Sequence, residues 1–229
     1  MASGFQVSAY YQHATSVASR ISWHVRQKMF EIFMDYFRPG PEISVLDVGV
    51  TSDESFQESN YFEKLYPYPH RITCVGTEDG SHLERQYPGL RYFRVKPGEK
   101  LPFDDRAFDV AFSNAVIEHV GSRGAQAGFG AELCRVGRAF FITTPNRWFP
   151  LEHHTGLPIV HWLPTKLYRA LLRNTRYGYW SDEEHLNILT ASALARLFPA
   201  SVKPVIRRVR LWGMCSNLVV LGRSSQERS

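Results

Sequence analysis

Residues 45–53 (VLDVGVTSD) constrain the fold of this chain more than any other segment. An apolar run suited to a buried strand ends at the acid Asp47, and Gly49 and small or polar residues follow it. Glycine has no Cβ, so Gly49 can adopt a positive φ and let a ligand lie against the main chain. Asp47 places a carboxylate at the carboxyl end of the strand, where open α/β sheets bind their ligands. The segment predicts a first βα turn that meets a ligand, with an ordinary tight turn as the alternative.

Strand and helix patterns alternate along most of the chain. Apolar runs predict strands at residues 43–48, 71–77, 90–95, 108–113 and 138–143. Helices are predicted at residues 15–37, 59–66, 81–87, 123–136 and 190–198. Two further strands, at 202–209 and 217–222, are joined by a short link and are expected to pair antiparallel. This order calls for an α/β fold with a doubly wound, mostly parallel sheet and helices on both faces.

The domain organisation follows from length and from one break in this alternation. The 229 residues suit a single domain with a full hydrophobic core. Residues 1–40 are expected to form an N-terminal helical segment of this domain. Residues 146–189 are rich in Trp, Tyr, His and Pro and do not resume the alternation. An inserted lid or substrate region is therefore predicted there. The tail, residues 224–229, is expected to fray.

Composition narrows the classes of function. No window approaches the ~18 consecutive apolar residues of a membrane-spanning helix, and the first residues do not have the pattern of a secretory signal. The three cysteines are widely spaced among apolar neighbours, which is typical of reduced thiols in a cytoplasmic protein. The net charge of +5 is mild, and no zinc-ligand spacing or RNA-binding motif indicates a nucleic-acid partner.

The second predicted strand also ends in acids, Glu78 and Asp79. An acid about thirty residues after the first turn can accept hydrogen bonds from both hydroxyls of a ribose. Asp79 also suits the N-cap of the helix that follows. We assign the ribose to Glu78 and the cap to Asp79, and Asp79 remains the alternative ribose ligand.

Two later segments are expected at the same edge of the sheet. Leu101, in LPFDD (101–105), is either an apolar wall for a purine ring or loop packing. After the fourth strand, Asn114 and Ala115 are expected to face the crevice with their backbone and small side chains. Glu118 and His119 begin the next segment and are expected to point a carboxylate and an imidazole toward the same space.

Three blocks together resemble a known family. VLDVG (45–49), VGTE (75–78) and LPFDDRAFDVAFSNAVIEHV (101–120) resemble class I S-adenosylmethionine-dependent methyltransferases of the methyltransferase-11 type. The resemblance spans about residues 45–145. It implies a Rossmann-like seven-stranded sheet whose last strand runs antiparallel, and S-adenosyl-L-methionine as the cofactor.

The resemblance also implies roles for particular residues. Those expected to meet the methionine part of the cofactor follow the first strand: Asp47, Gly49, Val50 and Thr51. Glu78 would hold the ribose, Leu101 would lie near the adenine, and Asn114 and Ala115 would line the floor. The sequence departs from the family in two places. The second glycine of the usual Gly-x-Gly turn is missing, and the stretch KPGEK (96–100) leaves Glu99 or a backbone group to meet the adenine amine.

Histidines are the candidate catalytic groups. His119 is the first candidate for a general base, because imidazole titrates near neutral pH and its position faces the crevice. A histidine that merely orders the loop is the alternative. His154 is the second candidate.

Four histidines of the 146–189 region raise the question of a metal site. They are His153, His154, His161 and His185. Adjacent histidines do not readily share one helical face, and no carboxylate completes a spaced set of ligands. We expect no metal, and histidines that line or order an acceptor pocket. Residues 157–172 are expected to form a lid or a helix packed on the core, with peripheral membrane contact as the less favoured alternative.

The sequence therefore predicts transfer of a methyl group from S-adenosylmethionine to a small-molecule acceptor. The segment after the fourth strand lacks the Asn/Asp-Pro-Pro-aromatic pattern associated with attack on base amines, so a nucleic-acid substrate is not expected. A non-catalytic cofactor-binding regulatory or partner protein is the alternative. A nicotinamide-dependent oxidoreductase would want Gly-x-Gly-x-x-Gly at the first turn, which the sequence does not supply.

Overall fold

The structure is a computed structural model that describes residues 16–224. Its centre is a seven-stranded sheet in the order β3-β2-β1-β4-β5-β7-β6. The strands are β1 (Val45–Val48), β2 (Ile72–Gly76), β3 (Arg91–Arg94), β4 (Phe108–Asn114), β5 (Gly137–Pro145), β6 (Val205–Leu211) and β7 (Met214–Arg223). The first five run parallel, and β7 pairs antiparallel with both β5 and β6. The predicted Rossmann-like sheet with an antiparallel last strand is confirmed.

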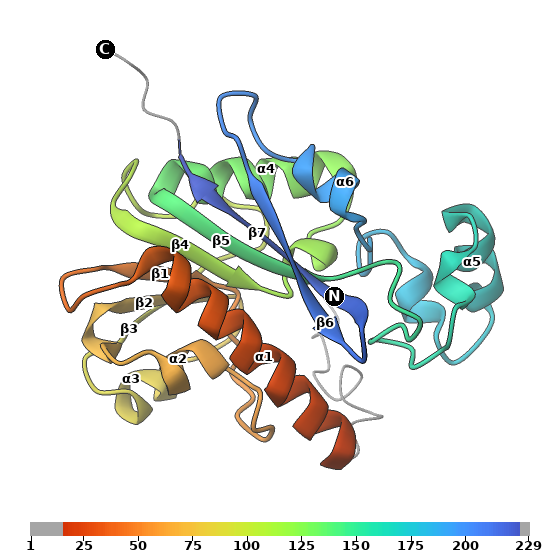
Figure 1. Ribbon diagram of the computed structural model, residues 1–229, viewed down its shortest axis with the longest axis horizontal. Coiled ribbons are helices and arrows are strands. Elements are labelled where there is room, and N and C mark those ends of the chain that lie inside the picture. Colours follow the sequence, from red (N-terminus) through yellow and green to blue (C-terminus); the bar gives the residue numbers. More distant parts are fainter. Residues whose placement is uncertain (1–15, 225–229) are drawn as a thin grey trace.

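Helices cover both faces of this sheet (Figure 1). One face carries α1 (Ser16–Phe37), α2 (Tyr61–Leu65) and α3 (His82–Gln86), and the other carries α4 (Arg123–Val136) and α6 (Ala191–Ala195). The helix α4 has the bounds predicted for it, and the Ser122 hydroxyl accepts from the Ala125 N–H at 3.2 Å to cap its first turn. The predicted residue Thr15 and most of the predicted fraying tail lie outside the described residues.

The two hydrophobic cores follow from the alternation of side chains along each strand. In β1, Val45 faces α1 and α2, whereas Leu46 and Val48 face α4 and α6. Phe33 of α1 occupies the centre of the first core. Its ring centroid lies between 4.9 and 6.2 Å from those of Phe62, Tyr66, Phe112 and Phe141. An aromatic cluster thus fastens α1 to the sheet.

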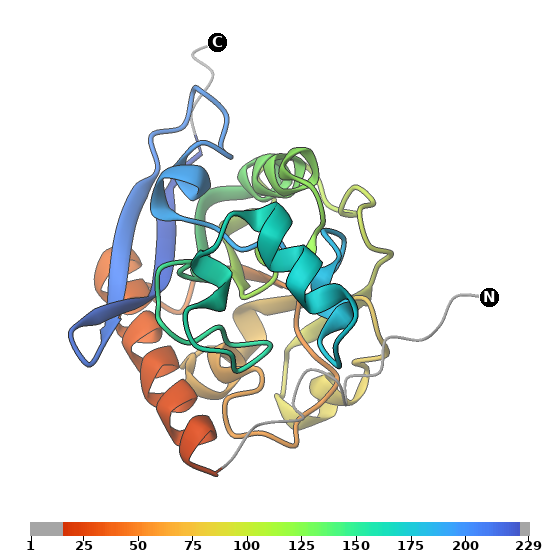
Figure 2. The same cartoon turned by 90° about the vertical axis from the view of Figure 1, so that its right-hand side faces the viewer.

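The segment 146–189 leaves the sheet where β5 ends and returns to it at the bridge between Asn146 and Leu189. It contains α5 (Thr165–Arg173) and its own small core, formed by Tyr168, Leu172, Trp180, Leu186 and Ile188. Figure 2 views the molecule with this insertion in front of the carboxyl ends of the parallel strands. The insertion therefore covers part of the edge at which α/β sheets bind ligands.

The structure bears on membrane-spanning helices and on the state of the cysteines. Within residues 16–224, no helix is long and apolar enough to cross a membrane. The three cysteines all lie in this described part and are free thiols.

Replacing Phe33 by Ala should lower the free energy of unfolding by about 3–5 kcal/mol, because the cavity cannot collapse among four neighbouring rings. Chemical denaturation measures the change. Val17→Ala, on the same helix but 61% exposed, is the control and should change stability by no more than about 0.5 kcal/mol. If Phe33→Ala lowered the free energy of unfolding by less than Val17→Ala does, the described packing of Phe33 would be wrong.

Candidate active site

The turn after β1 brings the β1 and β4 loops together. Gly49 has φ +102°, and its N–H and that of Val50 donate to the Val75 carbonyl at 2.8 and 3.2 Å. A Cβ on Gly49 would lie 2.2 Å from Cγ2 of Val116, which follows β4. Glycine is thus required twice, by the backbone conformation and by the close approach of this neighbouring loop.

An asparagine holds the loop that lacks the second glycine. The Asn60 side chain accepts from the Thr51 N–H at 3.0 Å and donates to the Thr51 carbonyl at 2.8 Å. Asn60 itself adopts a left-handed conformation, φ 44°, at the start of α2. The amide therefore fixes the backbone of Thr51 from both sides, and the loop keeps a defined path without Gly-x-Gly.

Glu78 follows β2, and its side chain reaches the loop after β1. Its Oε2 accepts a hydrogen bond from the Ser52 hydroxyl at 2.5 Å, and the Tyr92 hydroxyl donates to its backbone carbonyl. Asp79 is exposed, and its Oδ1 accepts from the Ser81 N–H at 3.0 Å in the turn that enters α3. That hydrogen bond lowers the pKa of Asp79. Asp79 thus has the placement that the capping role requires, while the ribose role of Glu78 stays a prediction.

Asp47 is buried against a second carboxyl group. It lies on the α1–α2 side of the sheet, level with Cys74 of β2, and hydrogen-bonds to Glu63 of α2. Burial, and then the charge of Glu63, raise the pKa of Asp47 well above its ordinary value. The Cys74 thiol donates to Glu63 at 3.3 Å. Two buried carboxyl groups in contact share a proton, and the predicted contact of Asp47 with the cofactor stays a prediction.

The remaining predicted cofactor residues lie on the β4 side. Asn114 Oδ1 accepts from the Thr143 hydroxyl at 2.6 Å, and the Ala115 N–H donates to the Thr143 carbonyl at 3.0 Å. Ala115 has φ +54°, so the chain turns sharply as it leaves β4. Leu101 is buried in the core beside α4, and its N–H donates to Glu132 at 2.8 Å.

A cavity of about 580 Å³ opens beyond the ends of β2 and β3. Its lining includes Thr77, which precedes Glu78, and Lys100 and Pro102, which flank Leu101 in the sequence. Neither Glu78 nor Leu101 itself lines the cavity.

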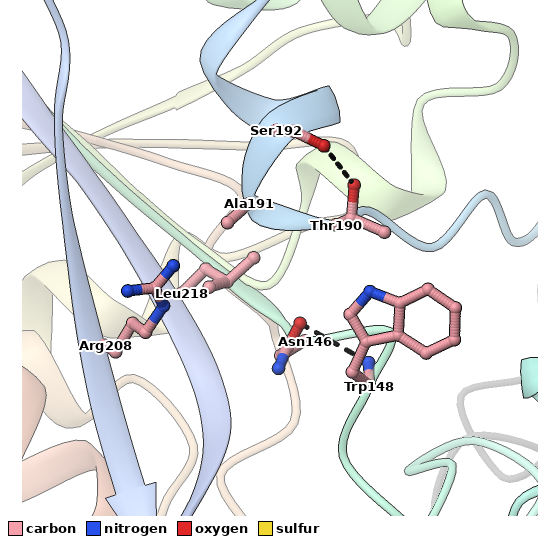
Figure 3. A pocket seen from close by; sticks show the side chains of 7 residues that line it. All are labelled: Asn146, Trp148, Thr190, Ala191, Ser192, Arg208 and Leu218. Atoms are coloured by element: carbon pink, nitrogen blue, oxygen red, sulfur yellow. Dashed lines mark hydrogen bonds between the residues drawn. The ribbon is translucent and has the colours of Figure 1, made fainter.

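A second, smaller cavity of about 270 Å³ lies where the insertion leaves and rejoins the sheet. Figure 3 shows Trp148 and Asn146 on one side of it and the Arg208 and Leu218 side chains on another, with the hydroxyls of Thr190 and Ser192 above them. None of the cofactor-binding residues predicted from the sequence lines it.

The two candidate catalytic histidines meet directly. His119 lies in a 3-10 turn (Ile117–His119) after β4, and His154 belongs to the insertion. Their Nε2 atoms are 3.1 Å apart, and the rings are nearly perpendicular. Trp180 of the insertion packs against both, with centroids 4.9 Å from His154 and 6.0 Å from His119. The structure thus brings residues 35 positions apart into one centre.

The other nitrogen of each ring is held by an oxygen. His154 Nδ1 lies 2.6 Å from a carboxylate oxygen of buried Glu152. Burial raises the pKa of Glu152, but the charge and hydrogen bonds of His154 outweigh it and hold that pKa below its usual value. His119 Nδ1 lies 2.7 Å from the backbone carbonyl of His185. Burial, and then His154, lower the pKa of His119.

Glu118 completes the group beneath the two rings. It is fully buried, and burial raises its pKa to about 7. One carboxylate oxygen accepts from the Thr144 hydroxyl at 2.9 Å. The other, Oε1, finds no hydrogen-bond partner among residues 16–224. Ligand atoms of Glu118, His119 and His154 all lie within 4.8 Å of one another.

Sequence reasoning missed the partners of the predicted residues. Ser52, Asn60, Glu63 and Glu152 each hold one of them, and most of these contacts join separate elements. Only Glu152 carried a local signal, since it stands two residues before His154 and can reach it within one turn.

Comparison with protein families identifies a methyltransferase domain in the chain. Residues 46–139 match the family described as a methyltransferase domain. No curated protein sequence matches the chain.

Solved structures show the same fold at low identity. An N1-methyltransferase of 1,6-didemethyltoxoflavin from Burkholderia thailandensis is 17% identical, with a TM-score of 0.61 over 96% of this chain and 85% of that one. A SAM-dependent methyltransferase from Methanosarcina mazei is 15% identical, with a TM-score of 0.57 over 86% and 98%. Geranyl diphosphate C-methyltransferase from Streptomyces coelicolor is 13% identical, with a TM-score of 0.56 over 96% and 88%.

The family match over residues 46–139 and the order of the seven-stranded sheet agree with each other. Both agree with a class I S-adenosylmethionine-dependent methyltransferase.

The buried carboxyl pair makes stability depend on pH. Asp47 has a folded pKa above its unfolded value of about 3.9, so its stabilising proton is fully bound below that pH and is lost as pH rises through the folded pKa. Asp47→Asn removes this titration. Between pH 4 and pH 8 the unfolding free energy of wild type should therefore fall relative to that of the variant.

Denaturant titrations at the two pH values measure this difference. Asp104→Asn, at an exposed carboxylate, is the matched control and should leave the pH dependence unchanged. Parallel stability–pH curves for wild type and Asp47→Asn would show that Asp47 does not hold a proton in the folded state.

Proposed function

We propose that this enzyme transfers the methyl group of S-adenosylmethionine to an oxygen, nitrogen or carbon of a small-molecule acceptor, by in-line displacement in a closed crevice. The observation that carries the proposal is the Glu78 carboxylate, half-buried between the ends of β1 and β2 and hydrogen-bonded to Ser52. A carboxylate at this place on an α/β sheet suits the hydroxyls of a ribose.

The residues present fit the cofactor. Gly49 supplies a turn without a side chain, and the Thr51 loop is fixed by Asn60, so the backbone after β1 is set before a ligand arrives. Glu78 would hold the ribose, with Leu101 and the neighbouring cavity beside the adenine. Gly49, Val50, Thr51 and Asp47 would face the methionine part, and Asn114 and Ala115 the floor.

The acceptor end of the crevice is assigned to the histidine centre. When bound, S-adenosylmethionine supplies a methyl group already activated by its sulfonium. The protein then has to orient the acceptor and exclude water, and take up the proton that an oxygen or nitrogen acceptor loses. His119 and His154 stand where the β4 loop meets the insertion, and Trp180 packs against both. The insertion would thus cover the acceptor while the histidines act on it.

A small-molecule acceptor agrees with the neighbours. One was crystallised with 1,6-didemethyltoxoflavin and S-adenosylhomocysteine, and another with geranyl diphosphate and S-adenosylhomocysteine. The chain lacks the Pro-Pro-aromatic motif of base-amine methylation after β4, so nucleic acid is not the proposed substrate. The free thiols suit a reducing compartment, and we assign the enzyme to the cytoplasm.

Glu78→Ala should weaken the binding of S-adenosylhomocysteine by at least ~1.5 kcal/mol, about tenfold, since a charge-assisted hydrogen bond to the ribose is lost. Calorimetric titration measures the change. Asp79→Ala is the matched control and should bind like wild type. If the two variants exchange behaviour, the ribose belongs to Asp79, and if neither weakens binding, the proposed ribose site is wrong.

His119→Ala should lower turnover about 10²-fold or more while cofactor affinity stays within twofold, because the residue acts on the acceptor and not on the cofactor. Methyl transfer to a panel of small acceptors from labelled S-adenosylmethionine provides the assay. His70→Ala, at an exposed histidine that belongs to no proposed site, is the control and should retain full activity. Full activity in His119→Ala would leave His119 a structural role, and cofactor binding without turnover in wild type would favour a regulatory protein.

A further inference from the structure

We propose that Glu118, His119 and His154 form a site for one divalent transition-metal ion, with Zn²⁺ as the representative species. The proposal departs from the sequence-based expectation of no metal, which considered ligands close in sequence. Metal binding itself does not depend on the proposed function. The role of a bound ion in orienting and polarising an acceptor atom does rest on that function.

The hydrogen bonds of the two rings fix where their lone pairs point. A backbone carbonyl only accepts, so His119 Nδ1, 2.7 Å from the His185 carbonyl, carries the hydrogen. The Glu152 carboxylate likewise accepts from His154 Nδ1, and also from the Thr155 N–H and hydroxyl at 2.7 Å each. In the neutral rings both Nε2 atoms therefore present lone pairs, and these lone pairs face each other.

The 3.1 Å contact between the two Nε2 atoms is an N–H···N hydrogen bond when a proton lies on one of them, and a metal ion can replace that proton. A metal bonded to each nitrogen at about 2.0–2.1 Å, with an angle between octahedral and tetrahedral, places the two nitrogens about 2.9–3.4 Å apart. The observed separation falls inside this interval. The rings already have the spacing of two adjacent ligands of one ion.

Glu118 supplies the third ligand. Its Oε1 is buried and has no hydrogen-bond partner within residues 16–224, which leaves a carboxylate oxygen without compensation. The three ligand atoms lie within 4.8 Å of one another. Bonds of about 2.0–2.2 Å require edges near 3.4 Å, so binding of the ion moves the carboxylate oxygen by up to about 1.4 Å. A bound cation would satisfy the oxygen that the protein leaves unpaired.

The surroundings are those of a metal centre. Metal-binding histidines generally donate their second N–H to a carboxylate or a backbone carbonyl, which orients the ring. His154 has Glu152 in this place, and His119 has the His185 carbonyl. Two imidazoles and one carboxylate suit Zn²⁺ and similar first-row ions, whereas Mg²⁺ and Ca²⁺ prefer oxygen ligands.

Calorimetric titration of chelator-treated, full-length protein with Zn²⁺ tests the site directly, without cofactor or acceptor. We expect one Zn²⁺ per chain and no heat from Mg²⁺. Glu118→Gln and His154→Ala should each weaken Zn²⁺ binding at least tenfold. Glu152→Gln, which weakens the orienting hydrogen bond but removes no ligand, should weaken it about 10–100-fold. Co²⁺ should give the visible absorption of a nitrogen-ligated ion, and that absorption should be lost in His154→Ala.

His153→Ala is the matched control and should bind Zn²⁺ like wild type. Circular dichroism verifies that each variant is folded. If His154→Ala does not fold, the Zn²⁺ affinity of Glu118→Gln alone tests the site. The proposal is overturned if wild type binds no Zn²⁺, or if binding survives in Glu118→Gln and is lost in His153→Ala. If wild type binds no Zn²⁺, the contact between the two imidazole rings is a hydrogen bond through a shared proton. Titrating the same metal-free sample with S-adenosylhomocysteine tests the cofactor site separately, so the two proposals fail independently.

Discussion

The parallel pairing of β1 with β2 on one side and β4 on the other is the constraint on which the site depends. Because neighbouring parallel strands end at the same edge, this pairing gathers the loops after them at one edge of the sheet. Gly49 makes the arrangement compact, since only glycine admits Val116 of the β4 loop so close to the β1 turn. The core beneath is correspondingly dense, with Phe33 set among four rings on one face of the sheet.

Polar contacts between loops then turn this edge into a site with two ends. At the β1–β2 end, Ser52 meets Glu78, and Asn60 fixes the backbone of Thr51. At the β4–insertion end, His119 meets His154, and Glu152 and the His185 carbonyl orient the rings. In the proposed function, the first end offers the Glu78 carboxylate to the hydroxyls of a ribose. The second end offers the imidazole nitrogens of His119 and His154 to the methyl acceptor.

The fold could be predicted from the sequence to a large extent because its signals are local. Apolar runs of strand length alternate with helical patterns, so the order of elements and the antiparallel final hairpin followed from the chain alone. The first turn and the acid Glu78 were visible for the same reason, as both stand directly at strand ends.

Contacts between distant segments could not be predicted in this way. Nothing near Asp47 in sequence indicates that Glu63 of α2 will meet it in the core. The pairing of His119 with His154 depends on where the insertion returns to the sheet, and single-sequence periodicity carries no information on that path. Adjacent histidines drew attention to residues 153–154, whereas the effective partner lies 35 residues earlier.

A crystal structure of the enzyme with S-adenosylhomocysteine would locate the nucleoside relative to Glu78. We expect both ribose hydroxyls on the Glu78 carboxylate, the adenine beside Leu101, and the sulfur directed toward His119. A nucleoside bound at another edge of the sheet, or a crevice closed by side chains that admits none, would contradict this expectation.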